Sequence, residues 1–214
     1  MVRSSSRRGV VAVAALALLA GFVDGFGYVY LGGYFVSFMS GNTTRVGVGL
    51  GADDLAAAGW GALLIASFVA GVMAGTVLAR PAWRWSSTAV LGLVALALAA
   101  AALLAASGVT PAAAAALAVG MGAVNTTFSG GGEVSFGITY TTGALVKIGQ
   151  GLVTALRGGS RTTWVRHLVL WLSILGGAGI GAFSQRTIGE AALWIAVAWV
   201  AVVAGTLQLR PAQR

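Results

Sequence analysis

The chain has 214 residues, of which 58% are hydrophobic and 8% are charged, and its mean hydropathy is +0.91. This composition excludes an ordinary soluble domain and indicates a polytopic membrane protein. The formal net charge of +8 does not indicate a nucleic-acid partner, because the basic residues lie between apolar segments and do not gather on one face. The absence of cysteine excludes disulfides, thiolate catalysis and Cys-based metal sites.

The N-terminal region has arginines followed by an apolar run, which is also the pattern of a secretory signal peptide. The run continues to Tyr30, however, and is therefore long enough to cross a bilayer. We interpret residues 10–30 as the first membrane helix, with the N-terminus in the cytoplasm.

Six stretches approach or reach the roughly 20 apolar residues that a membrane helix needs. They are residues 10–30, 55–79, 88–106, 111–128, 164–183 and 190–209. Glycine, proline and charged residues separate them, and no soluble domain fits between them. Two further segments, 34–51 and 135–156, are long enough to be helices but are more polar and rich in glycine.

These two polar segments share a pattern. Each has aromatic and hydroxyl residues before a central glycine, then a basic residue and a closing Gly-x-Gly-Leu. The matched residues include Asp24 and Asn125, Gly41 and Gly143, and Arg45 and Lys147. The recurrence predicts an all-α membrane helix bundle of two homologous repeats, 1–108 and 109–214, each with three apolar spans and one polar membrane helix. Many transporters place a central site at such a repeat interface.

The polar segments either cross the membrane, giving eight crossings and parallel repeats, or re-enter it, giving six crossings and inverted repeats. With six crossings, only Arg45 and Arg186 fall outside the cytoplasm, which agrees with the positive-inside rule. Against this, Gly32-Gly33 has the composition of a tight hairpin turn, and residues 135–156 are long enough to cross. Charge favours six crossings but leaves both arrangements open.

Asp24 lies about 20 Å along the first predicted helix, and therefore inside the bilayer. A carboxylate at that depth needs a partner or water, since leaving it bare costs several kcal/mol. Arg45 and Lys147 are the candidate charge partners. The alternatives are a structural ion pair, a neutral acid held by hydrogen bonds, or a role in coupling protons or cations to transport.

The hydroxyl and amide residues of the two polar segments suit either a binding site or close helix packing. As candidate substrate-binding residues we take Asp24, Ser40, Asn42, Thr43, Asn125, Thr139 and Thr142. An enzyme is not expected, because His167 is the sole histidine and no nucleophile has a visible activating base. We expect no metal and no cofactor.

The sequence also resembles the YoaK-like bacterial integral membrane proteins, a family of unknown function, over essentially the whole chain. The resemblance is carried by Asp24, Gly32-Gly33-Tyr34-Phe35-Val36, Ser40-Gly41-Asn42-Thr43, Met121-Gly122, Asn125 and Thr139-Tyr140-Thr141-Thr142-Gly143. It implies a multi-pass protein of the bacterial inner membrane with about six spans, and no established catalytic residues.

We therefore expect a small-solute transporter or permease with a central polar site, whose partners are the lipid bilayer, an unidentified small solute and, as a further option, a second copy of the chain. One alternative is a membrane scaffold or sensor subunit in which the polar motifs only join helices. Another is an intramembrane enzyme acting on a lipid or quinone.

Overall fold

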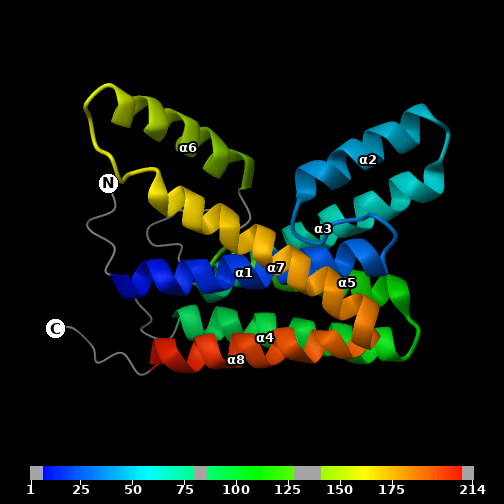
Figure 1. Cartoon of the computed structure of the whole chain (residues 1–214). Coiled ribbons are helices and arrows are strands. Elements are labelled where there is room, and N and C mark those ends of the chain that lie inside the picture. The colour runs from blue at the N-terminus through cyan, green and yellow to red at the C-terminus, as the bar shows by residue number, and fades with distance from the viewer. Residues whose placement is uncertain (1–6, 80–85, 128–140, 209–214) are drawn as a thin grey trace.

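The computed structural model describes residues 7–79, 86–127 and 141–208, and every regular element in these ranges is helical. The elements, shown in Figure 1, are α1 (Arg7–Tyr30), α2 (Met39–Gly51), α3 (Leu55–Leu78), α4 (Ser86–Ala106), α5 (Thr110–Val124), α6 (Thr141–Leu156), α7 (Val165–Ile188), the short 3-10 helix η1 (Gly189–Ala192) and α8 (Leu193–Gln208). The prediction of an all-helical protein is confirmed.

Four stretches of the described chain are apolar and long enough to cross a bilayer: Val11–Tyr30, Leu55–Leu78, Ser86–Ala106 and Val165–Thr206. The last of these includes α7, η1 and α8, and Figure 1 shows that α8 turns back against the direction of α7. Helix α5 is also apolar but shorter. These elements confirm that the chain is built for a membrane.

The centre of the bundle is a continuous apolar core formed mainly by α1, α4, α5 and α8. Its largest fully buried side chains include Phe26 of α1, Leu98 of α4, Met121 of α5 and Leu193 of α8. Helix α4 packs against both α5 and α8. The hydroxyl of Ser87 also donates to the carbonyl oxygen of Thr127 at 2.9 Å, which ties the start of α4 to the end of α5.

Helices α1 and α7 lie side by side in a parallel pair with their backbones in contact. A Cβ added at Gly21 would overlap the carbonyl oxygen of Ile174, and one at Gly25 would overlap that of Ala178. From the other side, Gly177 meets Leu18 in the same way. Such close approach is how helices pack where a bilayer supplies no hydrophobic drive to associate.

Helices α3 and α5 form a second parallel pair of the same kind. Gly71 of α3 lies against the backbone of Val119, and Gly122 of α5 lies against that of Phe68. The glycines in these four helices therefore mark two specific helix contacts.

The two polar helices lie outside this body. Helix α2 packs against α3, and α6 packs against α7. In Figure 1, α2 and α6 lie on the same face of the bundle and project toward opposite ends of it.

The helix boundaries differ from the sequence prediction mainly at α2, at α5 and at α7, which continues to Ile188 instead of ending at 183. Helix α2 begins at Met39, so the first five residues of the predicted helix 34–51 are not helical. Helix α5 ends at Val124 and is followed by a turn over residues 125–127, whereas the prediction continued to 128. Before α2, side-chain hydrogen bonds replace helical ones, as described below. After α5, the amides of residues 125–127 donate to backbone carbonyls three residues earlier. The part of segment 135–156 before Thr141 lies outside the described residues.

Candidate functional site

The segment joining α1 to α2, residues 31–38, folds back along α1 instead of leaving the bundle. Helix α1 ends in a turn in which the amide of Gly33 donates to the carbonyl of Tyr28 at 2.7 Å. Gly32 and Gly33 both have positive φ values, 64° and 100°, which glycine adopts without the steric cost of a Cβ. The reversal brings Val36 and Ser37 next to Asp24, a full turn and more before the end of α1.

Asp24 binds the backbone of this segment. Its Oδ1 accepts hydrogen bonds from the amides of Val36, at 2.8 Å, and Ser37, at 2.7 Å. Its Oδ2 accepts the hydroxyl of Ser37 at 2.5 Å. Both Val36 and Ser37 are buried. Because non-helical amides have no water to bind in a membrane interior, the carboxylate supplies the acceptors that the missing helical turn does not.

Asn42 of α2 binds the backbone of Phe35, the residue before Val36. Its Oδ1 accepts from the amide of Phe35 at 3.1 Å, and its Nδ2 donates to the carbonyl of Phe35 at 2.6 Å. The Asn42 side chain has 0% exposure. An amide side chain carries both a donor and an acceptor, so Asn42 satisfies both polar groups of one peptide residue. Asp24 and Asn42 together hold residues 35–37.

Aromatic rings pack around the same turn. The ring of Phe35 lies 5.1 Å from that of Tyr28 and 5.2 Å from that of Phe38, between ring centroids. A Cβ at Gly41 would lie 2.8 Å from the ring of Phe38 and 2.9 Å from that of Phe35. The central glycine of the first polar motif is therefore explained by ring packing.

Arg45 is not the partner of Asp24. Its guanidinium carbon lies 4.4 Å from the centre of the Tyr34 ring, a cation–π arrangement. The Tyr34 hydroxyl in turn donates to the carbonyl of Ala57 on α3 at 3.1 Å. Within the described ranges neither Arg45 nor Lys147 forms an ion pair, and Lys147 is exposed on α6. The charge pairing expected for Asp24 is replaced by hydrogen bonds to backbone amides and to Ser37.

The described structure has no hydrogen bond between Asp24 and Ser40, Thr43 or Thr142. Ser40 and Thr43 are exposed on α2, and the Thr43 hydroxyl donates to the carbonyl of Met39 at 2.9 Å. Thr142 is exposed on α6. Asn125 follows the last turn of α5, where its Nδ2 donates to the carbonyl of Met121 at 2.9 Å.

Thr139 lies outside the described residues. Of the predicted set, the structure brings together Asp24 and Asn42 on either side of residues 35–37.

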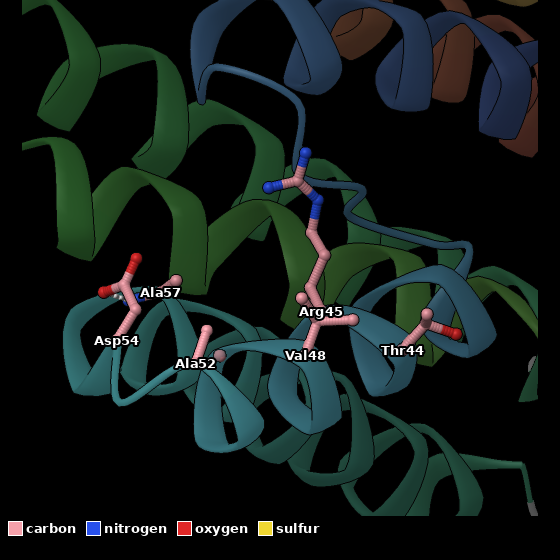
Figure 2. A pocket seen from close by; sticks show the side chains of 7 residues that line it. Thr44, Arg45, Val48, Ala52, Asp54 and Ala57 are labelled. Carbon is pink, nitrogen blue, oxygen red and sulfur yellow. Dashed lines mark hydrogen bonds between the residues drawn. The ribbon is translucent and has the colours of Figure 1, made fainter.

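A pocket of about 360 Å³ lies between α2 and α3. Figure 2 shows Arg45 and Asp54 well apart, with Ala52 between them and Val48 beside the base of the Arg45 side chain. Its lining residues are Thr44, Arg45, Val48, Gly49, Ala52, Asp54 and Ala57.

Sequence reasoning missed Tyr34, Ser37 and Asp54 as functional candidates. Tyr34 and Ser37 lie within the first copy of the repeated motif, which is the signal that could have identified them. Asp54 has no such signal, because in the sequence it is one of two acidic residues in a turn. Among the described residues no group of three or more His, Asp or Glu side chains could hold a metal ion.

The apolar helices, the glycine-packed pairs and the buried segment with side-chain partners define a helical integral membrane protein. The chain belongs to the family described as "Protein of unknown function (DUF1275)", which matches residues 12–206. It is similar to the UPF0700 transmembrane protein RA0705 of Rhizobium meliloti (strain 1021), with 38% identity over 193 residues, which cover 90% of this chain and 83% of that protein. No solved structure matches the chain.

Proposed function

We propose that the protein is a small-solute transporter of the bacterial inner membrane, built from two inverted repeats. The observation that carries the proposal is the non-helical backbone of residues 31–38, in which Val36 and Ser37 are buried and residues 35–37 are bound by Asp24 and Asn42. Non-helical backbone at membrane depth is tolerated where it is enclosed by protein or lines a cavity. Transporters use such discontinuous helices to form their binding sites at repeat interfaces.

The glycine contacts support the division into repeats 1–108 and 109–214. The contact of Gly21 with Ile174 corresponds to that of Gly122 with Phe68, and the contact of Gly177 with Leu18 corresponds to that of Gly71 with Val119. The α1 and α5 positions differ by 101 residues (122 − 21 and 119 − 18), and the α3 and α7 positions by 106 (174 − 68 and 177 − 71). The same two offsets therefore relate the two contacts of the α1–α7 pair to the two contacts of the α3–α5 pair.

The helix directions support inverted repeats with six crossings. In Figure 1, α1 and α7 run one way, and α3 and α5 run the opposite way. Helix α2 starts beside the middle of the body, because the residues just before it bind Asp24, and it runs toward the side on which α1 ends. Its 13 residues span about 20 Å, less than the roughly 30 Å of a hydrocarbon core. Helix α2 is therefore re-entrant in this proposal, and α6 is its counterpart.

Transport would proceed by rocking one repeat against the other, with the N-terminus in the cytoplasm. Asp24 and Asn42 hold the broken segment at the repeat interface, and the solute path is lined by Ser40, Thr43, Asn125, Thr139 and Thr142. The three hydrogen bonds to Asp24 favour a structural role for its carboxylate over a coupling role. In this proposal the protein is not an enzyme, and a homodimer would enclose the solute path. We also propose that the chain is a member of the YoaK-like family.

The natural absence of cysteine allows a direct test of the topology. Single cysteines at Thr43 and Thr142 are labelled from each side of the membrane with an impermeant thiol reagent. Inverted repeats predict that Thr43→Cys reacts from outside and Thr142→Cys from the cytoplasm. Leu117→Cys, at a fully buried core position, is the unreactive control, and Ala52→Cys is the exposed control. Labelling of both motif positions from the same side would contradict the inverted arrangement.

Transport itself is tested in sealed liposomes loaded with an equimolar mixture of small amino acids, carboxylates and sugars. Mass spectrometry then measures which solute is lost faster than from protein-free liposomes. We expect selective loss of one solute class, blocked when Thr43→Cys is labelled. Equal retention of every solute by folded, inserted protein would contradict transport for these classes.

The scaffold alternative also has an observation in its favour, since Asp24 and Asn42 are both occupied by the protein's own backbone. It predicts that changes at these residues lower stability in a protein that moves no solute. An enzyme acting on a lipid or quinone would turn over its substrate in micelles, without sealed vesicles.

A further inference from the structure

We propose that the pocket between α2 and α3 binds a small organic anion through the guanidinium of Arg45. This inference rests on the proposed function and deepens it. The pocket shares helix α2 with Ser40 and Thr43 of the proposed solute path, and the inference names the chemical class of the solute or lipid group that binds there. The inference is argued from the contacts of Arg45, from the volume and lining of the pocket, and from the two charged lining residues, Arg45 and Asp54.

The N–H donors of the Arg45 guanidinium are not used by its contact with Tyr34. Its recorded contact in the described part of the chain is the face of the Tyr34 ring, at 4.4 Å. A ring face takes none of the five N–H donors of a guanidinium, so within the described ranges these donors have no hydrogen-bond partner. The nearest acid in the sequence motif, Asp24, is already occupied by Val36 and Ser37.

The guanidinium is also held in position. Tyr34 is 8% exposed, its hydroxyl binds Ala57 of α3, and its ring lies 6.3 Å from that of Trp60. A Cβ at Gly33 would lie 2.6 Å from a guanidinium nitrogen of Arg45. Because the ring is fixed and glycine leaves the space that the guanidinium needs, Arg45 is ordered before a ligand arrives, which lowers the entropic cost of binding.

The pocket suits a small molecule with one negative group and an apolar body. Its volume of about 360 Å³ is at the small end of ligand sites. Val48, Ala52 and Ala57 form the apolar part of the pocket wall. The carboxylate of Asp54 lies away from Arg45 and accepts from the amide of Ala57 at 2.9 Å. A second negative group at that end would be repelled, whereas a carboxylate or phosphate at Arg45 forms charge-assisted, bidentate hydrogen bonds.

The test measures binding to the purified full chain in a phosphate-free maltoside detergent, with sodium butyrate and butylphosphonate as probes. Isothermal titration is expected to show saturable binding that weakens by about tenfold or more in Arg45→Gln, the cost of losing a charged hydrogen bond. Arg45→Lys, which keeps the charge but loses the planar fork, is expected to fall between the two. Arg186→Gln, a change at an exposed arginine of α7, is the matched control and should bind as the unchanged protein does.

Two further arms identify the source and the shape of the ligand. If a lipid phosphate is the natural occupant, phosphorus copurifies with the protein and is lost in Arg45→Gln. Asp54→Asn keeps an acceptor for the Ala57 amide and removes the charge, so it is expected to admit succinate, which the unchanged pocket rejects. Absence of both probe binding and bound phosphorus, in protein shown to be folded by circular dichroism, overturns the proposal, as does equal loss in Arg186→Gln.

The two proposals can fail separately. Anion binding in micelles with no flux in sealed liposomes would support the Arg45 site and contradict transport. Selective flux that is unchanged in Arg45→Gln and Arg45→Lys would leave transport and remove this site.

Discussion

The glycine-packed helix pairs and the segment 31–38 solve the same problem of cohesion in a membrane by opposite means. In the α1–α7 and α3–α5 pairs, the backbones touch because side chains are absent at Gly21, Gly25, Gly71 and Gly122. In segment 31–38 the backbone has left the helix, and two side chains, Asp24 and Asn42, bind its polar groups. Regular backbone needs only close packing in a bilayer, whereas irregular backbone also needs hydrogen-bond partners.

The largest effect is expected where a side chain is added between two backbones. In Gly25→Ala the new Cβ would overlap the carbonyl of Ala178, and neither helix backbone can yield locally. We expect the loss of at least about 4 kcal/mol of stability, at the upper end of single substitutions, measured by unfolding in micelles. Gly176→Ala is the matched control, because a Cβ there has nothing within 4 Å. Equal stability of the two variants would show that α1 and α7 are not in backbone contact.

The next largest effect is expected from removing the carboxylate of Asp24, which binds segment 31–38. Asp24→Leu leaves two buried amides and one hydroxyl without an acceptor, at about 1–3 kcal/mol for each unsatisfied group. Asp24→Asn keeps an oxygen at Oδ1, which accepts both amides, and should cost less than half as much in the same unfolding measurement. If the two variants are equally unstable, the negative charge and not the hydrogen-bond geometry holds the segment.

A smaller loss is expected at the other end of the same segment. Asn42→Leu removes the partners of the Phe35 amide and carbonyl, two groups instead of the three at Asp24, which gives an expected loss of about 2–6 kcal/mol. Thr43→Val is the neighbouring control, because its exposed hydroxyl bonds only within its own helix, and it should change stability by no more than about 0.5 kcal/mol. An effect of Thr43→Val as large as that of Asn42→Leu would contradict the role given to the Asn42 hydrogen bonds.

The smallest effect is expected at the contact between segment 31–38 and α3. Tyr34→Phe removes the hydroxyl that binds the carbonyl of Ala57 and keeps the ring beneath Arg45, so a loss of about 1 kcal/mol is expected. Hydrogen exchange at the start of α3 should rise in this variant while exchange in α5 stays unchanged. Faster exchange throughout the bundle would mean that this contact supports the whole fold.

The sequence by itself determined that the protein is helical and lies in a membrane. Apolar stretches of about 20 residues can satisfy their backbone only as helices in a bilayer, so the long helices were predicted close to their observed bounds. It also indicated that Asp24 needs a partner, because a carboxylate inside a bilayer must be satisfied, and it placed Asn42 among seven candidate site residues.

Only the tertiary structure decided what those polar residues bind. Sequence spacing suggested that Asp24 meets Arg45 or Lys147, since opposite charges are the obvious partners of a buried acid. The positive φ values at Gly32 and Gly33 instead return the chain to α1, so backbone amides reach the carboxylate first. Arg45 is thereby left over Tyr34, beside a pocket whose other end comes from α3. Such contacts depend on where the chain reverses, which hydrophobic patterning does not encode.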